Sequence, residues 1–118
     1  PAPPETEKMT GTVQLTAMKN GATLINTARG DLVDQSALVR ELETGRINAF
    51  LDVTNPEPLP AGHPLFELPN VLLTPHIAGS MGNELHRMAA YALDEIERFA
   101  AGESLRFPVQ LNDLARMA

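Results

Sequence analysis

Three reactive side chains follow three short apolar runs in the middle of this 118-residue sequence. They are Arg29, Glu57 and His76, and the apolar runs that precede them span residues 22–26, 47–53 and 71–74. In a parallel α/β sheet the strands end at a common edge, and ligands bind at that edge. Residue order alone therefore predicts that these three side chains lie near one edge of such a sheet.

Together the three side chains have the chemistry needed to reduce a 2-oxo acid. A guanidinium such as that of Arg29 can hold a carboxylate through two parallel hydrogen bonds. Histidine titrates near neutrality, so His76 could donate a proton to the carbonyl oxygen while hydride arrives at the carbon. Glu57 lies between Pro56 and Pro58, which restrict its backbone. A carboxylate beside an imidazole orients the ring and favours its protonated form.

Each of these residues also has an ordinary structural interpretation. Arg29 could form a surface ion pair with Asp31 or Asp34, which follow it closely in the sequence. His76 could be a structural residue at the end of a strand, and Glu57 could be a turn carboxylate in an acidic protein. Taken singly, the three residues do not decide between these interpretations.

Other polar residues carry weaker signals. Asp52 could cap the turn at residues 54–55 or accept a hydrogen bond from a cofactor amide. His63 lies in a proline-rich loop and His86 on the polar side of a predicted helix, so we expect neither to be catalytic. The histidines lack the spacing of a metal site. Residues 79–82 lack the strand-to-helix spacing of a glycine-rich phosphate loop.

Helical and strand patterns alternate around these residues. Helices are expected over residues 10–18, with Thr10 as a possible N-cap, from a cap at Asp34 through Leu42, and at roughly 82–101 with a broad apolar stripe. Five prolines between residues 55 and 69 exclude regular structure there, apart from a turn near 65–67. This order predicts an α/β fold with a three-stranded parallel sheet, right-handed crossovers and flanking helices.

Composition bounds the classes of protein to consider. The net charge of −6 and the scattered basic residues argue against a nucleic-acid or anionic-membrane surface. With no cysteine there is neither a disulfide nor a thiolate metal site, which leaves the redox compartment open, and no run of 18 apolar residues occurs. We therefore expect a soluble, cytoplasmic protein. Because the sequence begins with a proline-rich stretch and no Met, we also expect it to be a piece of a longer protein.

The ordered motifs resemble those of the D-isomer-specific 2-hydroxyacid dehydrogenases. The resemblance runs from about Pro3 to Ala101, and its motifs are INTARG at 25–30, LDV at 51–53, PEPL at 56–59, HPL at 63–65 and TPHIAG at 74–79. It implies a partial Rossmann-like, doubly wound parallel sheet. Residues 1–80 would be the C-terminal half of a dinucleotide-binding domain, 81–101 a long helix returning to a substrate domain, and 102–118 a C-terminal tail.

The resemblance also implies a role for each site residue. Arg29 would bind and polarise the 2-oxo acid, His76 would be the acid/base and Glu57 its partner. No metal is expected. The implied protein is an NAD(P)-dependent oxidoreductase that interconverts small D-2-hydroxy and 2-oxo acids, as a homodimer when intact. NAD or NADP would bind near Thr27, Ala28, Arg29, Asp52, His76, Gly79 and Ser80, with Asp52 at the nicotinamide carboxamide.

The sequence also departs from the family pattern. It lacks the glycine-rich pyrophosphate loop, the residue that selects NAD or NADP, and the first substrate domain. Two alternatives therefore stay open: a corepressor-like binding module of the same fold, and a fragment that is inactive without the N-terminal portion of its protein. The presence of Arg29, Glu57 and His76 together argues against the binding module, because a regulator does not need the acid. The particular 2-hydroxy acid is not decided.

Overall fold

The computed structural model describes residues 4–116, which divide along the chain into two compact units, with the boundary between Gly79 and Ser80. The first unit extends to Gly79 and contains the sheet, and the second begins at Ser80 and contains the long helix. Each unit is described by itself below.

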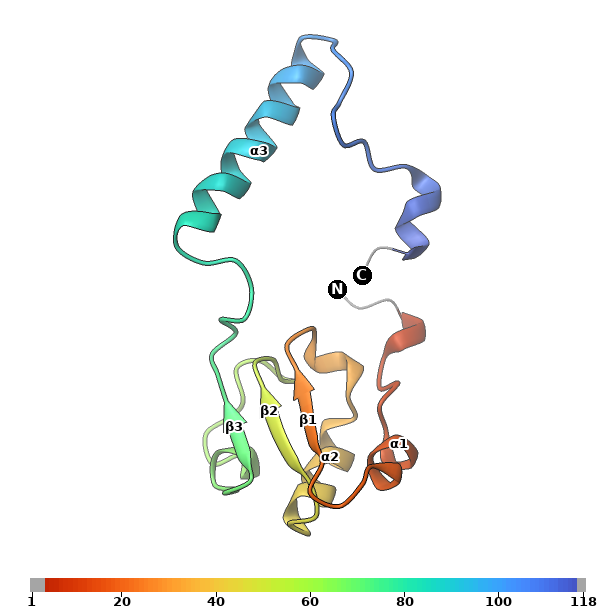
Figure 1. Ribbon diagram of the computed structural model, residues 1–118, viewed down its shortest axis with the longest axis vertical. Coiled ribbons are helices and arrows are strands. Elements are labelled where there is room, and N and C mark those ends of the chain that lie inside the picture. The colour runs from red at the N-terminus through yellow and green to blue at the C-terminus, as the bar shows by residue number, and fades with distance from the viewer. Residues whose placement is uncertain (1–3, 117–118) are drawn as a thin grey trace. The chain divides into compact units, whose positions relative to one another are not determined.

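The first unit is built on three parallel strands, β1 (Thr23–Asn26), β2 (Asn48–Leu51) and β3 (Val71–Leu73). They lie in the order β1-β2-β3, and their arrows point the same way in Figure 1. Parallel neighbours need crossover connections, which the intervening segments provide. The predicted three-stranded parallel sheet is confirmed.

Two helices accompany the sheet, α1 (Thr12–Ala17) and α2 (Gln35–Glu43). The predicted cap of α2 is confirmed, since the Asp34 carboxylate accepts a hydrogen bond from the backbone N–H of Ala37 at 3.0 Å. The predicted cap of α1 is wrong. Thr10 instead forms a parallel bridge with Val33, so its backbone is used in pairing, and Gly11 occupies the N-cap position.

The two faces of the sheet differ in what covers them. One face packs with α1, α2 and the loop after β2 around a core of buried side chains: Leu15, Val33, Ala37, Leu38, Leu42, Ile47, Ala49, Leu51 and Leu65. On the other face Ile25, Phe50 and Leu72 lie opposite one another in register and are 64%, 47% and 53% exposed. Alternation along each strand explains this split, because successive side chains point to opposite faces.

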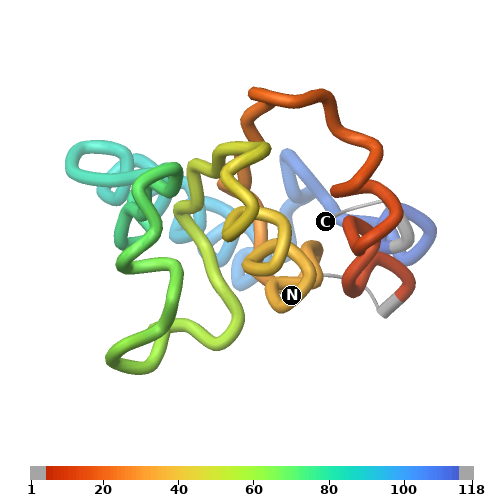
Figure 2. The backbone as a smooth tube through the Cα atoms, turned by 90° about the horizontal axis from the view of Figure 1, so that it is seen from below, coloured from red at the N-terminus to blue at the C-terminus, as the bar shows by residue number. Residues whose placement is uncertain are grey.

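The connection from β2 to β3 is a long excursion, visible in Figure 2 as the yellow-green to green segment. Its only regular element is the 3₁₀ helix η3 (Pro64–Phe66), close to the predicted turn. His63 caps η3, with the backbone N–H of Leu65 3.3 Å from its Nδ1. Two further 3₁₀ turns, η1 (Pro4–Thr6) and η2 (Gly30–Leu32), lie earlier in the unit.

The second unit consists of α3 (Asn83–Ala100), a return segment and the 3₁₀ helix η4 (Leu111–Arg116). The predicted long helix is confirmed. Its return segment packs back on it: the rings of Tyr91 and Phe107 lie 5.2 Å apart, and the Glu95 carboxylate accepts from the N–H of Arg106 at 3.1 Å. Within the described part of the chain, no helix combines the length and the apolar character needed to cross a membrane.

Candidate active site

Each of the three predicted catalytic residues follows the carboxyl end of a different strand. Arg29 comes three residues after β1, Glu57 six residues after β2, and His76 three residues after β3. Because the strands are parallel, these segments leave the sheet at the same edge. The sequence therefore predicted their location in the fold correctly.

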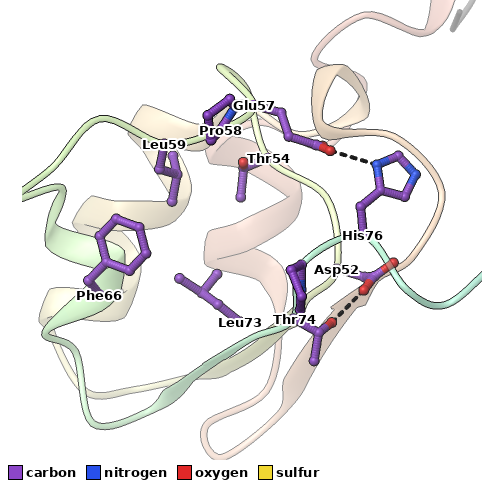
Figure 3. Close-up of a pocket in the computed structure, with 10 residues that line it drawn as sticks. Asp52, Thr54, Glu57, Pro58, Leu59, Phe66, Leu73, Thr74 and His76 are labelled. Atoms are coloured by element: carbon purple, nitrogen blue, oxygen red, sulfur yellow. Dashed lines mark hydrogen bonds and ion pairs between the residues drawn. The ribbon is translucent and has the colours of Figure 1, made fainter.

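Glu57 and His76 form a hydrogen-bonded pair, as predicted. His76 Nδ1 lies 2.6 Å from Glu57 Oε1, and Figure 3 shows the two side chains pointing toward each other. The hydrogen bond with His76 lowers the pKa of Glu57 below its ordinary value. An ionised carboxylate can only accept, so Nδ1 carries the hydrogen in this pair. The other ring nitrogen, Nε2, is then free to hold or release a second proton.

The backbone of His76 adopts an unusual conformation, with φ at +55°. Residues other than glycine rarely occupy this left-handed region, and holding one there costs about 1–3 kcal/mol. Asp52 supplies compensating contacts, since its backbone carbonyl accepts from the N–H of His76 at 3.0 Å. The residue directly after β2 therefore helps to fix the direction in which the imidazole projects from the backbone.

The Asp52 carboxylate is buried and is used almost entirely to hold the segment around His76. Its Oδ1 accepts from Thr74 Oγ1 at 2.5 Å and from the N–H of Ile77 at 2.8 Å, and its Oδ2 accepts from the N–H of Ala78 at 2.8 Å. The bond from Thr74, followed by those from the two backbone amides, lowers the pKa of Asp52. The proposed cap of the turn at residues 54–55 is therefore wrong: this carboxylate organises the segment after β3.

Arg29 is exposed, and its side chain does not contact the Glu57–His76 pair. Its Nη1 donates to the carbonyl of Ala28 at 2.6 Å. The surface ion pair with Asp31 or Asp34 is contradicted, because Asp31 instead binds Asn55 and Asp34 caps α2. The guanidinium therefore retains donors for a ligand.

Two cavities open at this edge of the sheet. The larger, of about 500 Å³, has Glu57 and His76 on one side and apolar side chains on the other (Figure 3). The smaller, of about 240 Å³, is mainly apolar. Both are lined by Asp52 and Thr74. The remaining lining residues of the smaller cavity are Thr27, Phe50, Leu51, Leu72, Ile77 and Ala78.

The predicted cofactor residues are only partly brought together. Thr27 and Asp52 line the smaller cavity, and Ala78, which was not predicted, lines it in place of the neighbouring Gly79. Ala28 and Gly79 lie outside its lining, while Ser80 begins the second unit. In the part of the chain that the structure describes, no three His, Asp or Glu side chains form a group that could hold a metal ion.

Sequence reasoning missed two residues that shape the site. Asn26 is buried at the end of β1, where its amide nitrogen donates to the carbonyl of Arg29 at 2.8 Å and its Oδ1 accepts from the N–H of Ala28 at 3.1 Å. An Asn directly before a turn is a known turn signal, so it could have been found. Thr74 had no such signal, because its partner Asp52 is 22 residues away.

Comparison with known proteins gives one family. The sequence profile described as the NAD-binding domain of the D-isomer specific 2-hydroxyacid dehydrogenases matches residues 1–78. A glycerate dehydrogenase of Methylorubrum extorquens is 42% identical over 106 residues, covering 87% of this chain and 34% of that protein. A glyoxylate/hydroxypyruvate reductase B of Citrobacter koseri is 42% identical over 97 residues, covering 81% of this chain and 30% of that protein.

Solved structures give the same result. The TT0316 protein of Thermus thermophilus is 47% identical with a TM-score of 0.85, covering 93% of this chain and 35% of that one. D-lactate dehydrogenase of Lactobacillus jensenii, solved with NAD+, is 36% identical with a TM-score of 0.82, covering 93% of this chain and 37% of that one. The expected partial Rossmann-like sheet is confirmed. The chain spans about a third of the length of the curated relatives named above.

Proposed function

Since this chain belongs to the family of D-isomer specific 2-hydroxyacid dehydrogenases, we propose that the protein containing it interconverts a D-2-hydroxy acid and a 2-oxo acid with NAD or NADP. The observation that carries the proposal is the 2.6 Å hydrogen bond between His76 Nδ1 and Glu57 Oε1 at the carboxyl edge of the sheet. A binding module would not need a proton carrier paired in this way.

The smaller cavity fits the nicotinamide. Its walls are mainly apolar, which suits the flat face of a nicotinamide ring, and Asp52 Oδ2 has one protein donor, Ala78, and further capacity to accept from a carboxamide. When bound, the cofactor supplies or takes the hydride. Thr27, Asp52 and Ala78 would hold it, and Asp52 would do so while it also holds the His76 segment.

Arg29 would bind the substrate carboxylate. Its guanidinium offers a planar pair of donors that matches a carboxylate, and it follows β1 at the edge where ligands bind. The same charge would polarise the 2-oxo group, which makes the carbonyl carbon more electrophilic. The substrates of the named relatives, glycerate, glyoxylate and hydroxypyruvate, support a small 2-hydroxy or 2-oxo acid.

His76 would be the acid in reduction and the base in oxidation. Glu57 accepts a hydrogen bond from Nδ1–H, so the proton delivered to the developing alkoxide would come from Nε2. The ionised Glu57 accepts from Nδ1 and so holds the orientation of the ring. In the reverse reaction, the neutral ring would take the hydroxyl proton at the same nitrogen.

Family membership also supports two finer proposals about the intact protein. We propose that it is cytoplasmic and that it acts as a homodimer whose substrate domain is formed by the remainder of the same polypeptide. Family membership is consistent with both.

The experiment is a turnover assay on the protein that contains this chain. NADH oxidation is followed with glyoxylate or hydroxypyruvate, for the wild type, for His76→Gln and for the matched control His86→Gln on α3. We expect His76→Gln to lower kcat by roughly 10²–10⁴-fold while NADH binding changes little, and His86→Gln to have no effect. Full turnover by His76→Gln would refute the assignment.

A further inference from the structure

Two loops at the carboxyl edge of the sheet are fastened to each other by one residue, Asn55. We call residues 27–33 the Arg29 loop and residues 54–58 the Glu57 loop. The Asn55 side chain donates from Nδ2 to Asp31 Oδ1 in the Arg29 loop. Its backbone N–H donates to Gln35 Oε1 in the first turn of α2, at 2.9 Å. The start of the Glu57 loop is thus held by the segment that follows β1.

The backbones of the two loops also touch. A Cβ placed on Gly30 would lie 2.1 Å from the carbonyl oxygen of Thr54 and 2.8 Å from the nitrogen of Asn55. Only a residue without a side chain permits this approach. The hydrogen bond between Asn55 and Asp31 joins the same two loops, so it restrains movement of one loop along the other.

The Asn55–Asp31 hydrogen bond lies close in the chain to Glu57, the partner of His76. Asn55 precedes Glu57 by two residues, and the segment between them is stiffened by a bond from Thr54 Oγ1 to the carbonyl of Pro56 at 2.9 Å. A displacement at Asn55 is therefore passed on to Glu57. A hydrogen bond of 2.6 Å is short, and it would be lost with a shift of about 1 Å.

Asn55 and Asp31 are both exposed, and neither belongs to the buried core. Exposed polar pairs usually contribute little to stability, about 0–1 kcal/mol. Global stability is therefore a weak explanation for a contact that joins two loops at the candidate active site. Control of the geometry of those loops is a better one.

We propose that Asn55 and Asp31 are positioning residues, whose hydrogen bond holds the Glu57 loop against the Arg29 loop so that Glu57 reaches His76. The role of this pair in catalysis rests on the proposed function, whereas the geometric coupling does not. Neither residue touches the reacting atoms. Both act through Glu57.

The test measures the pKa of Glu57 by ¹³C NMR of its carboxyl carbon in the 118-residue chain. In the wild type this pKa is below its ordinary value because of the bond with His76. In Asn55→Ala, which changes no charge, we expect it to rise toward the ordinary value of about 4.3. In Asp31→Ala, loss of a neighbouring negative charge alone would lower it, so a rise there reports a lost contact with His76.

A reciprocal variant and a control complete the set. Asp31→Asn with Asn55→Asp exchanges donor and acceptor, so the bond can form again. The carboxylate placed at position 55 also raises the pKa of Glu57, so this variant is compared with Asp31→Ala plus Asn55→Asp, which has the same charge without the bond. The pKa of Glu57 should be lower in the exchange variant. Asn112→Ala, an exposed Asn in the second unit, should leave it unchanged. The amide spectrum of each variant reports whether it is folded. If Asn55→Ala does not fold, Asp31→Ala and the exchange variant carry the test.

An unchanged pKa of Glu57 in folded Asn55→Ala and Asp31→Ala would overturn the proposal, and so would an exchange variant whose Glu57 pKa is as high as in Asp31→Ala plus Asn55→Asp. In the protein containing this chain, Asn55→Ala should lower kcat about tenfold with little change in KM, as a small misplacement of a catalytic group does. If the wild type has no turnover, the proposed function fails while the NMR result still decides the coupling.

Discussion

Replacing Gly30 with Ala should destabilise the first unit far more than a Gly-to-Ala change normally does. The added Cβ would lie 2.1 Å from the Thr54 carbonyl oxygen, and real Cβ atoms almost never approach closer than 3.0 Å. The opposing atom is backbone, so the Glu57 loop must retreat by at least the 0.9 Å between those two distances. No side-chain rotation can relieve the clash.

The expected cost follows from that displacement. Overpacking in a tight contact costs about 1–3 kcal/mol, and the retreat also weakens the bond from the Asn55 N–H to Gln35, worth roughly 1 kcal/mol. We therefore expect a loss of about 3 kcal/mol in the free energy of unfolding. For a domain of this size, that lowers Tm by roughly 12–24 °C.

The assay is urea denaturation followed by far-UV circular dichroism, with Gly79→Ala as the control. A Cβ on Gly79 meets no atom within 4 Å, so its effect should stay within about 1 kcal/mol. If Gly30→Ala and Gly79→Ala had the same denaturation midpoint and the same m-value, the inferred contact between the loops would be wrong.

Two further outcomes are expected of the chain itself. First, Asp52 and Glu57 have pKa values lowered in the folded state, by the bond from Thr74 and the bond with His76 respectively. Their contribution to stability is present above their unfolded pKa values, about 3.9 and 4.3, and is lost as the pH falls through the lower folded values. The urea midpoint should therefore be lower at pH 2.5 than at pH 6, and Asp52→Asn should show a smaller decrease. An equal midpoint at both pH values, together with an Asp52→Asn variant that behaves like the wild type, would contradict this. Second, the exposed row of Ile25, Phe50 and Leu72 and the unpaired outer edge of β1 should promote self-association. Light scattering should show species above 12.8 kDa that decrease in Phe50→Ser, and a stable monomer would refute the prediction.

The helices and strands could be predicted from the sequence because their signals are local. Short apolar runs between glycines, an Asp before a helical pattern and five prolines in one stretch each act within a few residues, and the three strands, α2 and α3 were found this way. The parallel arrangement also followed, because strands alternating with helices need crossovers. The beginning of α1 was predicted wrongly, since the pairing of Thr10 with Val33 joins residues far apart in the chain.

Most partners of the polar side chains were decided only by the tertiary structure. The pairing of Glu57 with His76 could be predicted, because strand order brings both to one edge and the family resemblance suggested the pair. Strand order does not determine, however, which partner a particular carboxylate or amide will bind. The bond from Thr74 to Asp52 spans 22 residues and that from Asn55 to Asp31 spans 24. The exact path of each loop decides which acceptor a donor meets, and that path depends on contacts such as Gly30 against Thr54.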